Sequence, residues 1–353
     1  MKPNINNIFA IASASEFNQM ALDIFNFQVK ENEVYNQYIT ALKIETNSIK
    51  EIKQIPFLPI EFFKSHTIVT ESSVKNQESG NQNQQPTTNN QQLFTSSGSV
   101  QSKHYVADVS IYEKSYLKAF ELFYGNINEY CILALLPSYL ERDGSSLIYM
   151  VDDLIKKSNH PESGFFLNNY DELIFKINKL EQQNQKTILI GVTYALLDLI
   201  EKLSPLERGL RGVSNQLIIM ETGGMKGKRK EMVREELHDI LCKGFGVNAI
   251  HSEYGMTELL SQGYSKGSGI FSCPPWMQVL IRDTNDPFSF LPPNRTGGIN
   301  VIDLANINSC SFIATQDLGR IVGDNTNNGF CNSFEVLGRF DNSDIRGCNL
   351  LVE

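Results

Sequence analysis

The chain has 353 residues, of which 41% are hydrophobic and 20% are charged. A chain of this length is expected to form one large domain with subdomains or two domains, with ample capacity for a buried core. The formal net charge of -9 at pH 7 and the lack of a sustained basic stripe argue against a protein that binds nucleic acids.

Cysteine usage and hydropathy indicate the compartment. The six cysteines lie far apart without CxxC spacing, which suits neither a disulfide framework nor a zinc site. No apolar run approaches the ~18 residues that span a bilayer, and no hydrophobic signal region follows Lys2. We therefore expect a cytoplasmic protein with no transmembrane segment.

The first segment, residues 1–75, is predicted to be mainly helical. Ser13 and Glu16 form a capping box that starts a long helix. Apolar residues then recur at helical spacing, at Phe17, Met20, Ala21, Ile24 and Phe27. Pro56 and Pro59 end the helical region and begin an extended segment.

Residues 76–92 are rich in Asn, Gln, Ser and Thr. Such a segment cannot bury enough apolar surface to offset the entropy of ordering it. We expect a mobile insertion that leads into the next motif.

Hydroxyl side chains cluster around Gly98 in residues 94–103, and Lys103 closes the cluster. Hydroxyls, exposed backbone amides and an ammonium all donate hydrogen bonds to phosphate oxygens. The pattern is not a Walker loop, which needs two glycines around the turn. The cluster indicates either a phosphate loop or a serine-rich surface turn.

Residues 93–268 show the pattern of an α/β core. Continuous apolar runs at residues 131–136, 187–192 and 216–220 alternate with helical stretches. One helix is expected over residues 228–242, with Met232, Val233, Leu237, Ile240 and Leu241 on one face and Gly244 as its C-cap. This pattern predicts a mostly parallel sheet covered by helices.

Glycine-bearing segments follow two of the expected strands, at residues 221–224 and 252–258. Ligands in such sheets collect at the carboxyl ends of the strands. Residues 269–353 instead contain short strand-like pieces at 278–282, 298–303, 312–315 and 334–337, which predict a small antiparallel subdomain.

Four short segments occur in a distinctive order: residues 95–103, Tyr-Gly-Met-Thr-Glu at 254–258, residues 314–319 around Asp317, and Gly-Arg-Phe-Asp at 338–341. Together they resemble the adenylate-forming superfamily of acyl-CoA synthetases, luciferases and peptide-synthetase adenylation domains. They match its phosphate loop, its YG-x-TE motif, its ribose-binding aspartate and its hinge. The resemblance implies the large α/β N-terminal domain of that superfamily, and ATP and Mg²⁺ as cofactors.

Two further segments, Pro56–His66 and Arg346-Gly347-Cys348, look more narrowly like the acyl-protein synthetase family of the LuxE type. That family supplies the ATP-dependent component of the fatty acid reductase of bacterial luminescence. The resemblance covers nearly the whole chain outside the Asn/Gln-rich insertion.

The resemblance assigns the phosphate and metal contacts. The β- and γ-phosphates would be cradled by Thr95, Ser96, Ser97, Gly98 and Ser99, and Lys103 would add a positive charge. Thr257 would hydrogen-bond the α-phosphate, and Glu258 would hold Mg²⁺, which prefers oxygen ligands. Glu258 could instead be an acid at a helix start, and Gly98 a simple turn glycine.

The resemblance also assigns the nucleoside contacts. Asp317 would accept hydrogen bonds from both ribose hydroxyls, with Arg339 assisting. Tyr254 would lie against the adenine. Gly223, Gly224 and Gly255 fit where the backbone approaches the nucleotide closely. The alternatives are that Gly223 and Gly255 are turn glycines and that Asp317 belongs to an ordinary turn. His251 is expected to be a packed strand-end residue rather than a base.

The chain ends just past the hinge motif, so the small C-terminal domain that normally carries the catalytic lysine is expected to be absent. In the acyl-protein branch the activated acyl group moves to a cysteine near the C-terminus. Cys348 is the candidate nucleophile, because Arg346 could favour its thiolate. It could also be a structural cysteine, and Cys331 is the next candidate.

The expected activity is activation of a carboxylic acid, in particular a fatty acid, as an acyl-adenylate that is passed to a protein cysteine. An acyl-reductase, an acyltransferase or an acyl carrier protein would be the partner. One alternative is a ligase that hands the acyl group to CoA or to a carrier protein. The other is a nucleotide-binding scaffold without catalysis.

Overall fold

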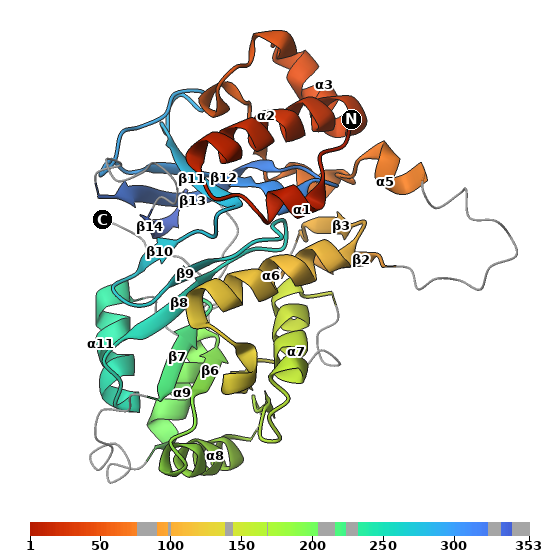
Figure 1. Ribbon diagram of the computed structural model, residues 1–353. Coiled ribbons are helices and arrows are strands. Elements are labelled where there is room, and N and C mark those ends of the chain that lie inside the picture. The colour runs from red at the N-terminus through yellow and green to blue at the C-terminus, as the bar shows by residue number, and fades with distance from the viewer. Residues whose placement is uncertain are drawn as a thin grey trace, which may run out of the picture. The chain divides into compact units, whose positions relative to one another are not determined.

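The computed structural model describes residues 1–75, 90–97, 100–137, 144–167, 169–203, 216–223, 232–323 and 333–340 (Figure 1). These residues form two compact units. Unit 1 contains Met1–Tyr116, Met256–Gln262 and Cys273–Phe334, and unit 2 contains Leu117–Gly255, Gly263–Ser272 and the described residues from Glu335 onward. The chain therefore crosses from unit 2 to unit 1 between Gly255 and Met256, inside the Tyr-Gly-Met-Thr-Glu motif.

Unit 2 is built on a mostly parallel sheet. Its strands are β4 (Cys131–Leu135), β5 (Gly164–Phe165), β6 (Thr187–Gly191), β7 (Leu217–Glu221), β8 (Ile250–Tyr254), β9 (Gly263–Ser265) and β10 (Ile270–Ser272). They occur in the order β10-β9-β8-β7-β6-β4-β5, in which β9 and β10 are antiparallel and the others parallel. The predicted fold class is confirmed.

Buried apolar side chains explain why the central strands of unit 2 form. Every residue of β4 and β6 is buried. Leu133, Leu189, Ile219 and Ile250 are successive Cα partners across four strands, and all are buried. Continuous apolar runs of this kind are typical of parallel strands whose two faces are both covered by helices.

Helices flank this sheet (Figure 1). They are α7 (Ser146–Ser158), α8 (Tyr170–Gln182), α9 (Thr193–Lys202) and α11 (Arg234–Phe245), together with the unit 2 part of α6 (Val109–Tyr124) and the short η3 (Ile127–Glu129). Helix α7 packs on β4, and α11 packs on both α9 and β8.

Helix α11 corrects two sequence predictions. It begins at Arg234, so Met232 and Val233 are not part of it, and Val233 is half exposed. Its C-cap is Gly246, which has a left-handed φ of 66°, rather than Gly244. Gly244 lies inside the helix, where a Cβ atom would stand 2.4 Å from Ile200 Cδ1. Close packing of α11 on α9, and not helix termination, therefore accounts for Gly244.

Unit 1 contains the antiparallel strands that the sequence predicted. Strands β11 (Met277–Arg282), β12 (Gly297–Asp303) and β13 (Phe312–Val322) pair antiparallel, and β1 (Leu58–Pro59) joins β13 in parallel. A separate hairpin is formed by β2 (Gln92–Thr95) and β3 (Lys103–Val106). Strand β14 (Ser333–Arg339) begins in unit 1 and continues in unit 2.

The helices of unit 1 are mostly N-terminal. They are α1 (Ile5–Ile8), α2 (Ala14–Glu31), α3 (Glu33–Ala41), α4 (Phe62–Ser65) and α5 (Glu71–Lys75), with the 3-10 turns η1 (Thr46–Ser48), η2 (Ile52–Gln54) and η4 (Leu304–Asn306). The predicted cap of α2 is present, since the Ser13 hydroxyl accepts a hydrogen bond from the Glu16 N–H at 3.3 Å. The Glu16 carboxylate in turn accepts one from the Ala12 N–H at 2.8 Å.

Helix α2 also holds the loop that follows η4. The buried Gln28 amide donates to the carbonyls of Asn306 and Ile307 at 3.0 and 3.1 Å, and accepts from the Ser311 N–H at 3.0 Å. The Asn32 amide donates to the Ser309 carbonyl at 3.0 Å. The backbone N–H and carbonyl groups of this buried loop form no regular strand pairing, so they need side-chain partners. Gln28 and Asn32 supply these partners.

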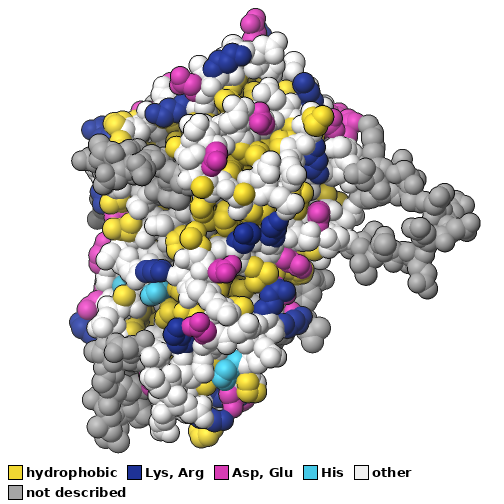
Figure 2. All heavy atoms as spheres, in the orientation of Figure 1, with side chains coloured by type: hydrophobic (Ala, Val, Ile, Leu, Met, Phe, Trp, Pro, Cys, Tyr) yellow, Lys and Arg dark blue, Asp and Glu magenta, His cyan; other side chains and the backbone are white. Residues whose placement is uncertain are grey.

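Among the described residues, no helix is both long and apolar enough to cross a membrane. On the face shown in Figure 2, basic and acidic side chains of the described residues are interspersed rather than gathered into a stripe of one sign.

Candidate active site

The β2–β3 hairpin carries the described part of the expected phosphate loop. Thr95 and Lys103 are Cα partners at the end of the hairpin next to its connecting loop. Beyond them, the Ser96 N–H donates to the Ser102 carbonyl at 3.0 Å, and the Ser102 N–H donates to the Ser96 hydroxyl at 2.8 Å. Ser96 is therefore buried in closing the turn, whereas Ser97 and Lys103 are exposed. Gly98 and Ser99 lie outside the described residues.

His104 ties this hairpin to the segment that carries Thr257. Successive side chains of a strand point to opposite faces, so Lys103 is exposed while His104 is wholly buried. The His104 ring packs edge-on against Phe63, with ring centroids 5.5 Å apart. Its Nδ1 donates to the Thr257 carbonyl at 2.8 Å, across 153 positions of sequence. Burial lowers the pKa of His104 to about 4, so the ring is neutral at pH 7.

Thr257 and Glu258 lie in a tight turn. The Leu259 N–H donates to the Met256 carbonyl at 3.1 Å, and no helix begins there. The alternative that Glu258 is an acid at a helix start is therefore wrong. The Asn306 amide donates to the Glu258 carbonyl at 2.8 Å. The Glu258 side chain is itself wholly buried.

Asp303 holds the residues just after this turn. Its carboxylate accepts from the N–H groups of Leu260 and Ser261 at 2.7 and 3.0 Å, and from the Ser261 hydroxyl at 2.6 Å. A fourth bond comes from the Ala305 N–H at 3.2 Å. Burial raises the pKa of Asp303 to about 6, although these donors favour the carboxylate. No sequence motif marks Asp303, Asn306 or His104 as part of a site.

The donor set around Glu258 fits Mg²⁺ bound together with a nucleotide. Among the described residues, no three His, Cys, Asp or Glu side chains gather to hold a metal ion. Mg²⁺ is commonly bound through one or two carboxylates, with substrate phosphates and water completing the octahedron. A single carboxylate on a firmly held turn is compatible with that mode of binding.

Asp317 is an interior residue of β13. Its side chain is 4% exposed, and its N–H donates to the Thr315 hydroxyl at 3.1 Å. Gln316 points to the opposite face, where its amide donates to Glu61 at 2.6 Å. The alternative that Asp317 belongs to an ordinary turn is wrong, because the strand continues to Val322.

In unit 2, Gly223 follows the end of β7 in a left-handed conformation, with a φ of 74°. Its N–H donates to the Glu221 carboxylate at 2.6 Å. The same buried carboxylate lies 3.4 Å from the Thr193 hydroxyl and 3.8 Å from His238 Nε2. Although burial disfavours its charge, His238 and neighbouring Arg234 lower the pKa of Glu221 to about 2. Gly224 lies outside the described residues.

The end of β8 is packed rather than open. Tyr254 is 4% exposed and meets Phe271 edge-on, with ring centroids 5.9 Å apart, whereas Gly255 is exposed. Burial and the Glu221 carboxylate raise the pKa of Glu253 to about 8, so this acid carries a proton at pH 7.

His251 and Arg339 complete the described site residues of unit 2. His251 lies on β8, and Tyr124 approaches its Nδ1 at 3.2 Å. The interpretation of His251 as a packed strand residue is confirmed. Arg339, the last residue of β14, is partly exposed.

Burial raises the thiol pKa of three of the four cysteines that the structure describes. Burial raises the pKa of Cys131 to about 11 and that of Cys310 to about 12, and it also raises the pKa of Cys242. Cys273 is buried. The two candidate nucleophiles, Cys331 and Cys348, lie outside the described residues.

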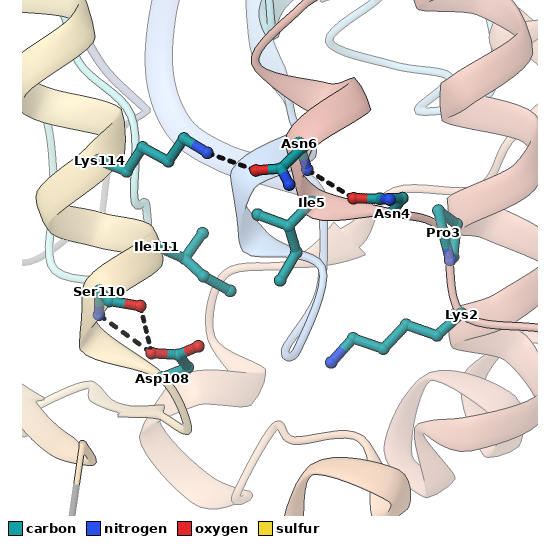
Figure 3. A pocket seen from close by; sticks show the side chains of 9 residues that line it. All are labelled: Lys2, Pro3, Asn4, Ile5, Asn6, Asp108, Ser110, Ile111 and Lys114. Carbon is teal, nitrogen blue, oxygen red and sulfur yellow. Dashed lines mark hydrogen bonds between the residues drawn. The ribbon is translucent and has the colours of Figure 1, made fainter.

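A surface cavity of about 520 Å³ in unit 1 contains none of the expected site residues. The Lys2 side chain points into it (Figure 3). Lys114 donates to the Asn6 amide oxygen at 2.7 Å, and Asp108 accepts from the N–H and hydroxyl of Ser110. Because most of its polar side chains bond to one another, this cavity gives no reason to place the chemistry there.

No protein-family model matches the sequence, and no curated protein matches it. Solved structures of a 2-hydroxyisobutyryl-CoA ligase do resemble the chain. The open conformation, in complex with 2-HIB-AMP and CoA, has a TM-score of 0.61 at 12% identity and covers 94% of this chain and 72% of the ligase.

Two other states of the same ligase agree. The postadenylation state with 2-HIB-AMP has a TM-score of 0.60 at 11% identity and covers 94% of this chain and 69% of the ligase. The thioesterification state with 2-HIB-AMP and CoA has a TM-score of 0.56 at 12% identity and covers 94% of this chain and 70% of the ligase. The chain therefore shares the fold of an adenylate-forming acid–CoA ligase.

Proposed function

We propose that this protein is an ATP-dependent acid–thiol ligase. It activates a carboxylic acid, and in particular a fatty acid, as an acyl-adenylate and transfers the acyl group to a cysteine thiol. The proposal places it in the adenylate-forming superfamily and, more narrowly, near the acyl-protein synthetases of the LuxE type.

One observation carries the proposal: the hydrogen bond from His104 to the Thr257 carbonyl at 2.8 Å. It joins the residue that directly follows the phosphate-loop motif to the Tyr-Gly-Met-Thr-Glu motif, which lies more than 150 residues further along the chain. Both motifs are expected to bind phosphate and metal. Asp317 supplies the third motif in the same unit, as a carboxylate on a β-strand. Three motifs that lie in the same compact unit and carry residue types suited to the same ligand are hard to explain as unrelated turns.

The first half-reaction follows from these residues. A carboxylate oxygen of the acid attacks the α-phosphorus of ATP, and pyrophosphate leaves. The Thr257 hydroxyl is suited to donate to an α-phosphate oxygen, and Lys103 and Ser97 are exposed and able to meet the leaving phosphates. Mg²⁺ held by Glu258 would neutralise the charge that develops on the phosphates.

In the second half-reaction a thiolate attacks the acyl carbonyl, AMP leaves, and a thioester forms. Burial of the described cysteines raises the pKa of Cys131 and of Cys310, so neither is suited to this role. We assign the attack to Cys348. The alternative acceptors are CoA and an acyl carrier protein.

Exchange of labelled pyrophosphate into ATP tests the first half-reaction. With Mg²⁺ and a panel of acids from acetate to long-chain and aryl acids, at least one acid should support exchange. Asp317→Ala should weaken ATP binding by roughly 2–4 kcal/mol because ribose hydroxyls lose their acceptor. Gln316→Ala, on the opposite face of β13, is the matched control and should exchange normally. No exchange with any acid would favour a non-catalytic nucleotide-binding scaffold.

Labelling with ATP and a radioactive acid tests the second half-reaction. The acyl-enzyme should survive denaturation and be released by neutral hydroxylamine, as thioesters are. Cys348→Ser should abolish labelling and leave exchange intact, whereas Cys331→Ser should change neither. Robust exchange without a labelled protein would make CoA or a carrier protein the acceptor.

A further inference from the structure

The turn that carries Thr257 and Glu258 has no regular secondary structure to hold it in place, yet two successive carbonyls of this turn are bonded to buried side chains. His104 donates to the carbonyl of Thr257, and Asn306 donates to the carbonyl of Glu258, each at 2.8 Å. Both side chains are buried, at 0% and 1% exposure. Neither residue belongs to the motifs assigned to ATP.

One donor precedes the turn in the sequence and the other follows it. His104 lies on β3, directly after Lys103 of the phosphate hairpin. Asn306 ends η4, and its own carbonyl accepts from Gln28 of α2 at 3.0 Å. The turn is thereby connected to both the hairpin and the N-terminal helix.

The chemistry of His104 suits a fixed donor. A carbonyl oxygen can only accept, so Nδ1 must carry the proton of the neutral ring. Nε2 is buried, and the ring also interacts with the Asn306 side chain. The Nδ1–H forms the hydrogen bond to the turn that a substitution of His104 removes.

We propose that His104 and Asn306 are positioning residues that hold the carbonyls of Thr257 and Glu258, and thereby aim the Thr257 hydroxyl and the Glu258 carboxylate at the α-phosphate and Mg²⁺. The inference rests on the proposed function for its catalytic consequence. Its structural part, the anchoring of residues 257 and 258, does not depend on that function.

Two amides test which atom of His104 matters. Asn places its side-chain N–H where Nδ1 stands, and Gln places its own near Nε2. His104→Asn should therefore preserve the bond to Thr257, while His104→Gln should lose it. We expect His104→Gln to lower the maximal rate of pyrophosphate exchange about tenfold, the factor that corresponds to loss of one such hydrogen bond. His104→Asn should stay within about threefold of the wild type.

The kinetic constants separate positioning from a general loss of folded protein. His104→Gln should raise the Mg²⁺ concentration needed for half-maximal exchange and leave the KM for the carboxylic acid unchanged. Asn306→Leu should behave in the same way, because it removes the second donor. A loss of folded protein would lower the maximal rate without changing the Mg²⁺ concentration needed for half-maximal exchange. That result would overturn the proposal.

Hydrogen–deuterium exchange supplies a readout without ATP. Amide exchange in residues 257–262 of the full chain should be about tenfold faster in His104→Gln and close to the wild type in His104→Asn. Equal protection in all three proteins overturns the proposal. Absence of pyrophosphate exchange in the wild type would refute the proposed function, whereas normal wild-type activity with no difference between the Asn and Gln variants would refute this inference alone.

Discussion

Asp303 gives the sharpest test of how unit 1 is held together. Its carboxylate is fully buried and accepts from three N–H groups and one hydroxyl at 2.6–3.2 Å. In Asp303→Ala the N–H groups of Leu260, Ser261 and Ala305 lose their acceptor. The Ser261 hydroxyl still has Ser115, 3.0 Å away.

The expected cost follows from that count. A buried donor without an acceptor costs ~1–3 kcal/mol, and a loop relaxes enough to recover part of the sum. We expect Asp303→Ala to lower the free energy of unfolding by ~3–5 kcal/mol, as other broken buried networks do. Asp303→Asn keeps one acceptor oxygen and should cost ~1–2 kcal/mol.

Urea unfolding at pH 7, followed by fluorescence and far-UV circular dichroism, measures both values. The control is Asp286→Ala, which removes a carboxylate that accepts from a hydroxyl and an N–H in an exposed loop. It should leave the unfolding midpoint nearly unchanged. An Asp303→Ala variant as stable as this control, or an Asp303→Asn variant as damaged as Asp303→Ala, would refute the network described for residues 260–261.

Three further predictions concern unit 2. The pKa of Glu253 is raised from 4.5 to about 8 on folding, so the folded state binds more protons between these values and loses stability as the pH rises through them. Glu253→Gln should therefore raise the free energy of unfolding relative to the wild type, by at least ~2 kcal/mol more at pH 8 than at pH 5. If the free energies of unfolding of the two proteins change in parallel with pH, the prediction is wrong. Gly244→Ala should cost ~1–3 kcal/mol in thermal unfolding, because its Cβ would meet Ile200 at 2.4 Å. Gly246→Ala should cost ~1 kcal/mol in the same assay, because its φ of 66° is left-handed.

Much of the fold could be predicted from the sequence, because hydrophobic patterns are local. The apolar runs at 131–136, 187–192 and 216–220 became β4, β6 and β7, and the strand-like pieces after residue 277 became β11 to β13. The capping box at Ser13 is also a local pattern, and α2 begins beside it. The bounds of helix α11 were harder to predict, because tertiary packing on Ile200 explains Gly244 and a left-handed φ makes Gly246 the C-cap.

The polar framework of the candidate site could not be predicted in this way. His104, Asp303 and Asn306 are ordinary polar residues in the sequence, and their roles depend on partners 43 to 153 positions away. One local signal was available for His104, since strand alternation buries the residue next to an exposed Lys103. The motifs that we expect to bind ATP could be identified only because their order resembles that of a known superfamily.

The proposed activity depends on attack of the carboxylic acid on the α-phosphorus of ATP. The most direct measurement uses an accepted acid with both carboxylate oxygens labelled with ¹⁸O, with products analysed by mass spectrometry after transfer to the thiol. We expect AMP that carries one ¹⁸O atom, and unlabelled pyrophosphate. Formation of ADP with ¹⁸O in orthophosphate would instead show attack at the γ-phosphorus and would refute the proposed acyl-adenylate.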